Sequence, residues 1–226
     1  MTSPARTRPA KPPRKLEQDR RSLLKGAVLS AAMAAVATPA SGRSTMKRPS
    51  AEEIIKLLDL APNATCGFVR VTYMAKLNIA AGGLPAPFAD GRPLGSGLYF
   101  LVTPHAPVRP HRIRNDQLYH YYLGDPLELF LLHGDGGVER VVVGPDIAAG
   151  HRVQLLIPGN TFRTARLLGQ GEWFLGGSTE WPGVVPTEDV EIDDVDKLAQ
   201  QYPEAADDIR AIIASVRQVP APGGPR

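Results

Sequence analysis

Short apolar runs separated by turn residues are the feature that most constrains how this chain can fold. Between residues 98 and 177 these runs alternate with Pro, Asp-Pro and Gly clusters. The interruptions recur at intervals of roughly ten residues, the spacing of strands joined by tight turns. Because no helix-length segment intervenes, roughly eight strands can dispose of their edges only by forming a barrel or a double-sheet roll. The sequence therefore predicts a mainly β fold, with strands at residues 66–77, 98–103, 108–114, 118–123, 127–133, 138–143, 153–157, 161–168 and 171–177.

Short helices are expected at both ends of this β region. Ser50 and Glu53 form the spacing of a capping box, and an apolar stripe follows them. Near the other end, Asp193 or Asp194 can cap a helix over residues 195–202. Pro203 opens a second helix, with Ala206, Ile209, Ile213 and Val216 at helical spacing. We expect both tail helices to dock on the barrel. Residues 78–97, dense in Gly and Pro, are interpreted as a long loop that could cover the barrel mouth.

The first forty residues are typical of an export signal. A basic, Pro-rich segment precedes the pair Arg20-Arg21, two leucines and a weakly apolar run at 27–37. This layout matches a signal peptide, and the run is too short to span a bilayer. The paired arginines resemble the twin-arginine signal. An ordinary Ala-rich helix is the alternative, although its Pro- and Gly-containing flanks disfavour it. We therefore predict a cleaved twin-arginine signal at 1–40 and a periplasmic or extracellular protein.

The remaining boundaries follow from composition. Residues 41–49 are interpreted as a linker, 50–218 as the folded domain and 219–226 as a disordered tail. Residues 1–48 hold eleven Lys or Arg and two acidic side chains, which leaves 15 basic and 21 acidic side chains, a net charge of −6, in the rest. No basic patch remains to suggest nucleic acid as a partner. Beyond the export signal, we expect no stable membrane insertion.

Cys66 is the only cysteine in the sequence. An intramolecular disulfide and a cysteine-based metal site are both impossible with one thiol. No neighbouring feature would lower its pKa, so a small packed residue is a better interpretation than a nucleophile.

The core stretch resembles the cupin superfamily, in particular a branch of small bacterial and fungal cupins (DUF985 or Cupin_5-like). The motifs that carry this resemblance are His111-Arg112, Asp116-Gln117, 119–122 and 124–129; later ones lie at 143–146 and 158–162. It covers roughly residues 52–214. The resemblance implies a jelly-roll (double-stranded β-helix) barrel with short flanking helices, often as a homodimer. The activity of this branch is mostly unassigned.

The resemblance also bears on metal binding, because cupin enzymes commonly hold a transition metal with two His, a Glu and a third His. Here His111 stands at the first His position, whereas Ile113, Gln117 and Arg163 stand at the other three. Arg163 places a permanent positive charge where a cation should sit. We therefore predict no metal and no other cofactor.

Proton-transfer chemistry is the activity that the remaining residues would allow. In a regular strand, Gln117, Tyr119 and Tyr121 share one face while His120 and Tyr122 take the other. His111 is the candidate general acid or base, because an imidazole titrates near neutral pH. Tyr99, Tyr119 or Tyr121 is the candidate second proton donor, an arrangement that resembles the His and Tyr pair of metal-free sugar epimerases of the superfamily.

Ligand binding is assigned to a second set of side chains. Arg163 could hold a carboxylate, an enolate or a phosphate. The other candidates are Gln117, Tyr99, His120 and Phe162. Packing with satisfied polar tips is the alternative role for His120 and, less strongly, for His111.

The sequence thus predicts an exported cupin that binds a small anionic or hydroxylated organic molecule. Metal-free isomerisation, epimerisation or cyclisation is the candidate reaction. A non-catalytic ligand-binding cupin is the first alternative, favoured if His111 is hydrogen-bonded away from the cavity. A metal-dependent cupin oxygenase or isomerase is the second, against which the missing ligands count.

Overall fold

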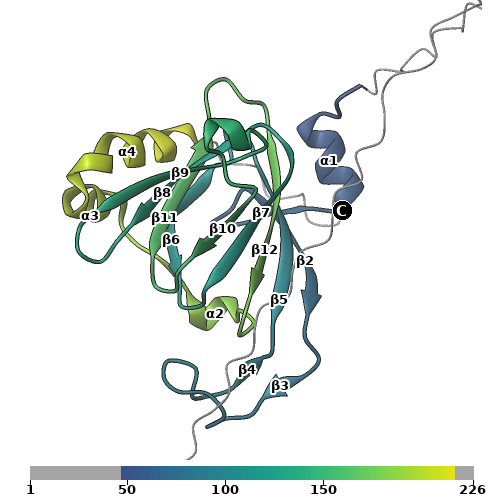
Figure 1. Cartoon of the computed structure of the whole chain (residues 1–226), viewed down its shortest axis with the longest axis vertical. Coiled ribbons are helices and arrows are strands. Elements are labelled where there is room, and N and C mark those ends of the chain that lie inside the picture. Colours follow the sequence, from purple (N-terminus) through teal and green to yellow (C-terminus); the bar gives the residue numbers. More distant parts are fainter. Residues whose placement is uncertain (1–46, 217–226) are drawn as a thin grey trace, which may run out of the picture. The chain divides into compact units, whose positions relative to one another are not determined.

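Two antiparallel sheets face each other in the computed structural model, which describes residues 47–216. The first sheet has the order β1-β2-β5-β12-β7-β10, and the second has the order β13-β6-β11-β8-β9 (Figure 1). Strands of the first sheet are β1 (Ala61–Pro62), β2 (Phe68–Met74), β5 (Ser96–Val102), β7 (Gln117–Gly124), β10 (Gln154–Ile157) and β12 (Phe174–Glu180). Strands of the second are β6 (Val108–Ile113), β8 (Leu127–Leu132), β9 (Val138–Val143), β11 (Phe162–Leu167) and β13 (Val190–Ile192).

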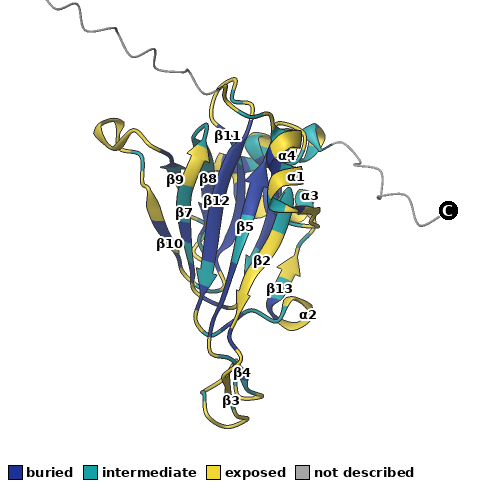
Figure 2. Cartoon of the chain, turned by 90° about the vertical axis from the view of Figure 1, so that its right-hand side faces the viewer, coloured by how far each residue is buried: buried dark blue, intermediate teal, exposed yellow. Residues whose placement is uncertain are grey.

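The main core lies between the two sheets. Inward-facing residues of β5, β7, β8 and β12 form one cluster that includes Phe100, Tyr119, Leu129 and Phe174. Figure 2 shows β5 and β12 largely buried and β2, which only the two-residue strand β1 borders on its outer side, largely exposed. A core shared by two facing sheets is the double-sheet roll that the apolar runs and turn residues predicted.

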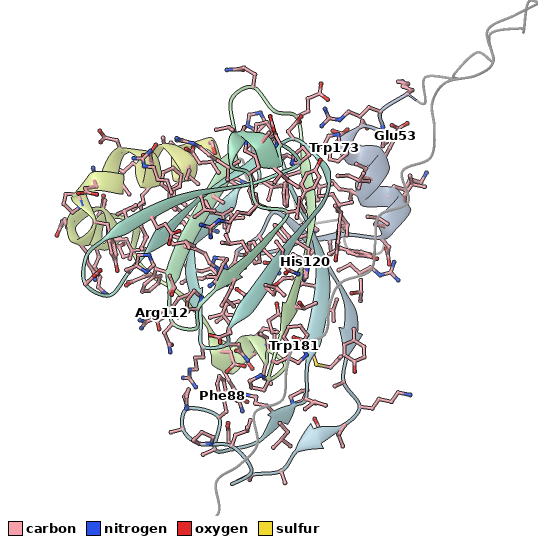
Figure 3. The ribbon with its side chains drawn as sticks, viewed as in Figure 1. Glu53, Phe88, Arg112, His120, Trp173 and Trp181 are labelled. Atoms are coloured by element: carbon pink, nitrogen blue, oxygen red, sulfur yellow. The ribbon has the colours of Figure 1, made fainter. Side chains whose placement is uncertain are left out.

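The helices cover both outer faces. α1 (Ala51–Leu58) begins with the predicted capping box, in which Ser50 and Glu53 bond each other's backbone. It packs Ile54 with Leu101 and Leu175 of the first sheet and with Trp173, which precedes β12. Trp173 lies beside this helix in Figure 3. Shorter helical segments are η1 (Ile147–Ala149) and α2 (Pro186–Asp189).

The tail helices pack on the second sheet, as expected. α3 (Val195–Gln201) is capped by Asp194; η2 (Pro203–Ala205) and α4 (Ala206–Ser215) follow. The predicted stripe on α4 was wrong in its second half: Ile209 and Ile212 are buried, whereas Ile213 and Val216 are not. η2 starts the stripe earlier, because Ala205 is already buried.

The predicted strand at 171–177 is displaced, since β12 begins at Phe174 and continues to Glu180. The Asp125 carboxylate accepts the backbone N–H groups of Glu172 and Trp173, which holds that segment as a loop. At its far end β12 pairs Glu180 with Ser96 and with Gln117. This extension brings a carboxylate into the interior.

The 78–97 segment is not structureless. It contains the short pair β3 (Asn78–Ile79) and β4 (Arg92–Pro93). Arg92 anchors it, because its buried guanidinium pairs with Asp90, Glu188 and Asp189. β13 and α2, which supplies Glu188 and Asp189, have no counterpart among the predicted elements.

The export signal predicted at 1–40 and the tail predicted at 219–226 lie outside the described residues. Within the predicted linker, Arg48 forms a bidentate pair with Asp125 and stacks over Trp173. Of the helices in the described part of the chain, none has the length and apolarity needed to cross a membrane.

Candidate functional site

A pocket of about 120 Å³ lies between the two sheets. Its walls come from β2, β5, β6, β7 and β12, together with the segment that carries α2 and β13. Most of the wall is apolar: Val69, Val71, Leu98, Phe100, Ile113 and Val184. Asn63 and Thr65 stand at the rim. The pocket is therefore a small apolar chamber, and its few polar groups decide what it can bind.

Glu180 is the centre of the polar end. It is 1% exposed. Gln117 Nε2 donates to its Oε1 over 3.0 Å, and Ser178 Oγ donates to the same oxygen. Ser96 Oγ donates to Oε2 over 2.6 Å. Three donors around one carboxylate are the compensation that a buried charge requires.

Arg163 carries a positive charge on the side of Gln117 that faces away from Glu180. Its Nη2 donates to Gln117 Oε1, and its Nη1 donates to the Thr161 carbonyl over 3.4 Å. The side chain is fully buried and is not part of the pocket wall. The Gln117 carboxamide thus stands between guanidinium and carboxylate, accepting from one and donating to the other.

His111 is held in one orientation by the backbone. Its Nδ1 donates to the Arg109 carbonyl over 2.7 Å, and its Nε2 lies 3.8 Å from Cys66 Sγ. Burial and the nearby charge of Arg163 hold the pKa of His111 well below its usual range. The imidazole is therefore neutral, with the proton on Nδ1 and a lone pair on Nε2, and it lines the pocket.

Cys66 and Tyr119 keep their protons. Burial raises the pKa of the Cys66 thiol. Burial is also the larger cause of the raised pKa of the Tyr119 phenol, and the neighbouring Cys66 is the second cause. Both residues line the pocket beside His111. At neutral pH the described wall therefore holds a thiol, a phenol and a neutral imidazole.

Three of the predicted site residues, His111, Gln117 and Tyr119, meet in this pocket, and Arg163 lies directly behind it. Tyr121 faces the same interior but lies outside the pocket wall, because its hydroxyl donates to the Gly124 carbonyl over 2.9 Å.

The remaining three predicted site residues, Tyr99, His120 and Phe162, lie on the outer faces of the sheets. Tyr99 packs against the cluster formed by Ile54 of α1 with Leu101 and Leu175. The His120 ring is hydrogen-bonded to Thr179 Oγ1 over 3.0 Å and to Gln154 Nε2 over 3.3 Å. Figure 3 shows it on β7. Phe162 is buried with the tail helices on the far side of β11. The structure does not bring these three side chains to the pocket.

The prediction omitted Glu180, Ser178 and Ser96. A signal was present, since Phe174, Gly176, Ser178 and Glu180 alternate with period two and share the inner face. Ending the strand at Gly177 removed the last two from consideration.

The donor set does not fit the metal that cupin enzymes hold. Within residues 47–216, no three His, Cys, Asp or Glu side chains are grouped as a metal site requires. His111 and Arg163 are direct cross-strand partners on β6 and β11. A fixed cation facing the one imidazole of the pocket opposes a second cation there.

Two antiparallel sheets around an interior pocket define a cupin-type roll. The model of the family described as Cupin superfamily (DUF985) matches residues 52–191, so the chain belongs to this family. The resemblance inferred from the motifs is thereby confirmed at the level of the family. No curated protein sequence matches the chain.

Two of the solved structures that are similar to this chain show the shared fold. An X-ray structure of a Shewanella oneidensis protein is 24% identical, with a TM-score of 0.63, covering 75% of this chain and 99% of its own. A hypothetical protein from Leishmania major is also 24% identical, with a TM-score of 0.64, covering 75% and 100%. These similarities confirm the predicted mainly β jelly-roll with short helices.

Proposed function

We propose that this chain binds a small organic molecule in the pocket between its sheets, through protein side chains rather than through a metal. The observation that carries the proposal is the polar end of an otherwise apolar chamber, where Glu180, Gln117 and Ser96 are held in fixed hydrogen bonds. Such a combination of apolar walls and a few oriented polar groups is typical of ligand sites.

The size of the pocket limits the ligand. An apolar cavity of about 150 Å³ accommodates benzene. The pocket here measures about 120 Å³, so it suits a molecule of roughly one small ring. Strand β2 borders it, and the 56% exposure of Val71 leaves room for larger substituents to extend outward.

Filling the pocket tests the proposal. Leu98 faces the interior and lines the pocket, whereas its neighbour Tyr99 faces outward. We expect a thermal-shift screen of small ring alcohols, amines and acids to yield ligands for the wild-type chain. Leu98→Trp should abolish their binding, and Tyr99→Trp should leave it unchanged. Binding that survives Leu98→Trp would place the ligand elsewhere.

Acid/base catalysis is the second candidate, and the His111 tautomer favours it. The Arg109 carbonyl accepts a hydrogen bond from the Nδ1–H group, so the Nε2 lone pair is available at the pocket as a proton acceptor. Tyr119 remains protonated and can act as a donor. Ligands from the screen should then exchange a carbon-bound hydrogen in D₂O, seen by NMR, and His111→Asn should stop the exchange. Exchange at the uncatalysed rate would leave binding as the function.

Export and self-association complete the proposal. Export is supported by the paired arginines before the apolar run, and Arg20→Lys with Arg21→Lys should retain the protein in the cytoplasm on cell fractionation. The homodimer is supported by the family resemblance, and light scattering of the purified chain measures it.

A further inference from the structure

We infer that this pocket selects a neutral ligand that donates a hydrogen bond, such as a small hydroxylated ring, that it disfavours carboxylates and phosphates, and that Glu180 is the residue that sets this preference. The inference rests on the proposed function and narrows its ligand class. It departs from the anionic ligand that Arg163 suggested in the sequence.

The donors at the buried end are already committed to protein acceptors. Gln117 Nε2 has two hydrogens, one for Ser178 Oγ over 3.1 Å and one for Glu180 Oε1. The hydroxyls of Ser96 and Ser178 both point to Glu180. The Nδ1 hydrogen of His111 points away from the pocket, to a backbone carbonyl.

The acceptors, in contrast, are not saturated. A carboxylate offers about four lone-pair sites, and Glu180 receives three donors in the described structure. Its Oε2 has only Ser96 as a partner there, so it can accept again. His111 Nε2 has only the weak thiol of Cys66 nearby. A ligand entering this end therefore meets free lone pairs.

Two donors remain in the described wall at that end. These are the Tyr119 phenol and the Cys66 thiol, and the thiol lies 3.8 Å from His111 Nε2. Both groups are neutral. They can contribute a hydrogen bond to a hydroxyl oxygen, but they offer no charge to a carboxylate.

The positive charge of Arg163 is not available to an anion. Its guanidinium is fully buried behind Gln117 and already donates to that carboxamide and to Thr161. Its Nε has no partner within the described residues, yet the side chain contributes nothing to the pocket wall. An incoming anion would meet the Glu180 carboxylate first, where like charges repel at low dielectric.

Affinity measurements with three ring compounds of similar size test this inference. Isothermal titration calorimetry of the full chain at neutral pH would use phenol as the neutral donor, toluene as the apolar control and benzoate as the anion. Phenol should bind at least about tenfold more tightly than either, because a hydrogen bond to a charged acceptor is among the stronger ones.

Variants assign the preference to one carboxylate. Glu180→Gln should reduce phenol affinity by about tenfold while changing toluene affinity by less than about twofold. Glu128→Gln is the matched control, because Glu128 pairs with Arg166 away from the pocket. It should change neither affinity. The wild-type order of phenol and benzoate is a second test that needs no variant to fold.

Each other outcome overturns the inference. Benzoate binding as tightly as phenol would do so, and so would an unchanged phenol preference in Glu180→Gln. If none of the three compounds binds although the earlier screen yields another ligand, the inference is wrong and the proposed function stands. If the screen yields no ligand either, both are wrong.

Discussion

The two faces of the neighbouring strands β7 and β12 carry similar residue types in opposite physical situations. On the inner face, Gln117, Ser178 and Glu180 are almost fully buried and bond one another. On the outer face, His120 and Thr179 form a comparable hydrogen bond while remaining partly accessible to water.

Solvent access accounts for the difference between the faces. A polar group in water loses little when its partner is removed, because water replaces the partner. A group without water bears the full desolvation penalty, and a buried charge bears more than a neutral one. Polar residues on the inner face should therefore matter far more for stability than those on the outer face, although both occur on the same strands.

Removing Glu180 should produce the largest effect. Glu180→Leu leaves the buried Arg163 charge without its counterpart and should lower the free energy of unfolding by about 3–5 kcal/mol. Adding Arg163→Met should cost less than the sum of the two single changes, because both charges are then removed. Thr179→Val, one position away on the outer face, should cost less than about 1 kcal/mol. Urea denaturation measures the free energy of unfolding of the two single variants, the double variant and Thr179→Val. Equal losses in Thr179→Val and Glu180→Leu would contradict the inferred difference between the two faces.

Features that depend on local sequence could be predicted, whereas those that depend on pairing between distant strands could not. The strands followed from local apolar runs bounded by turn residues, and β9 spans the predicted residues 138–143. Alternation also placed Gln117 and Tyr119 on the inner face. The partner of Glu180, however, is Ser96, distant in the sequence, and only the register of β5 with β12 brings them together.

The outer-face candidates show the limit of residue type as evidence. His120 and Tyr99 have side chains that catalysis and binding commonly use, yet the strand register directs them away from the pocket. Arg163 faces inward, but the Gln117 side chain lies between its guanidinium and the pocket. The type of residue at position 163 does not predict that separation.

Two adjacent glycines of β12 give the next largest expected effect. A Cβ on Gly176 would lie 2.6 Å from the His120 carbonyl oxygen and 2.5 Å from the Phe174 ring. Since neither backbone nor core can yield, Gly176→Ala should cost about 1–3 kcal/mol. A Cβ on Gly177 would meet the Tyr122 ring, whose 43% exposure lets it swing into solvent. Gly177→Ala should therefore cost less than about 1 kcal/mol. Thermal denaturation compares them, and a larger loss at 177 would contradict the assignment of faces.

The two histidines sharpen the comparison through their pH dependence. Burial and Arg163 hold the pKa of His111 well below its usual range, whereas burial lowers the pKa of the partly exposed His120 less. An unfolded histidine binds a proton below about pH 6.5, and native His111 does not. Protons therefore favour the unfolded state as the pH falls, and stability should decrease by up to about 1.4 kcal/mol per pH unit.

The window from pH 6.5 to 5 isolates this effect. The carboxylates of Asp90, Asp125 and Asp193 have pKa values below the usual range, so the stability they contribute is lost only at lower pH. His111→Asn should flatten the pH dependence of unfolding between pH 6.5 and 5, and His120→Asn should preserve most of it. Because each variant is compared with itself across pH, any loss of stability common to both pH values cancels. A pH dependence that disappears in His120→Asn but persists in His111→Asn would show that the outer-face histidine, and not the buried one, excludes the proton.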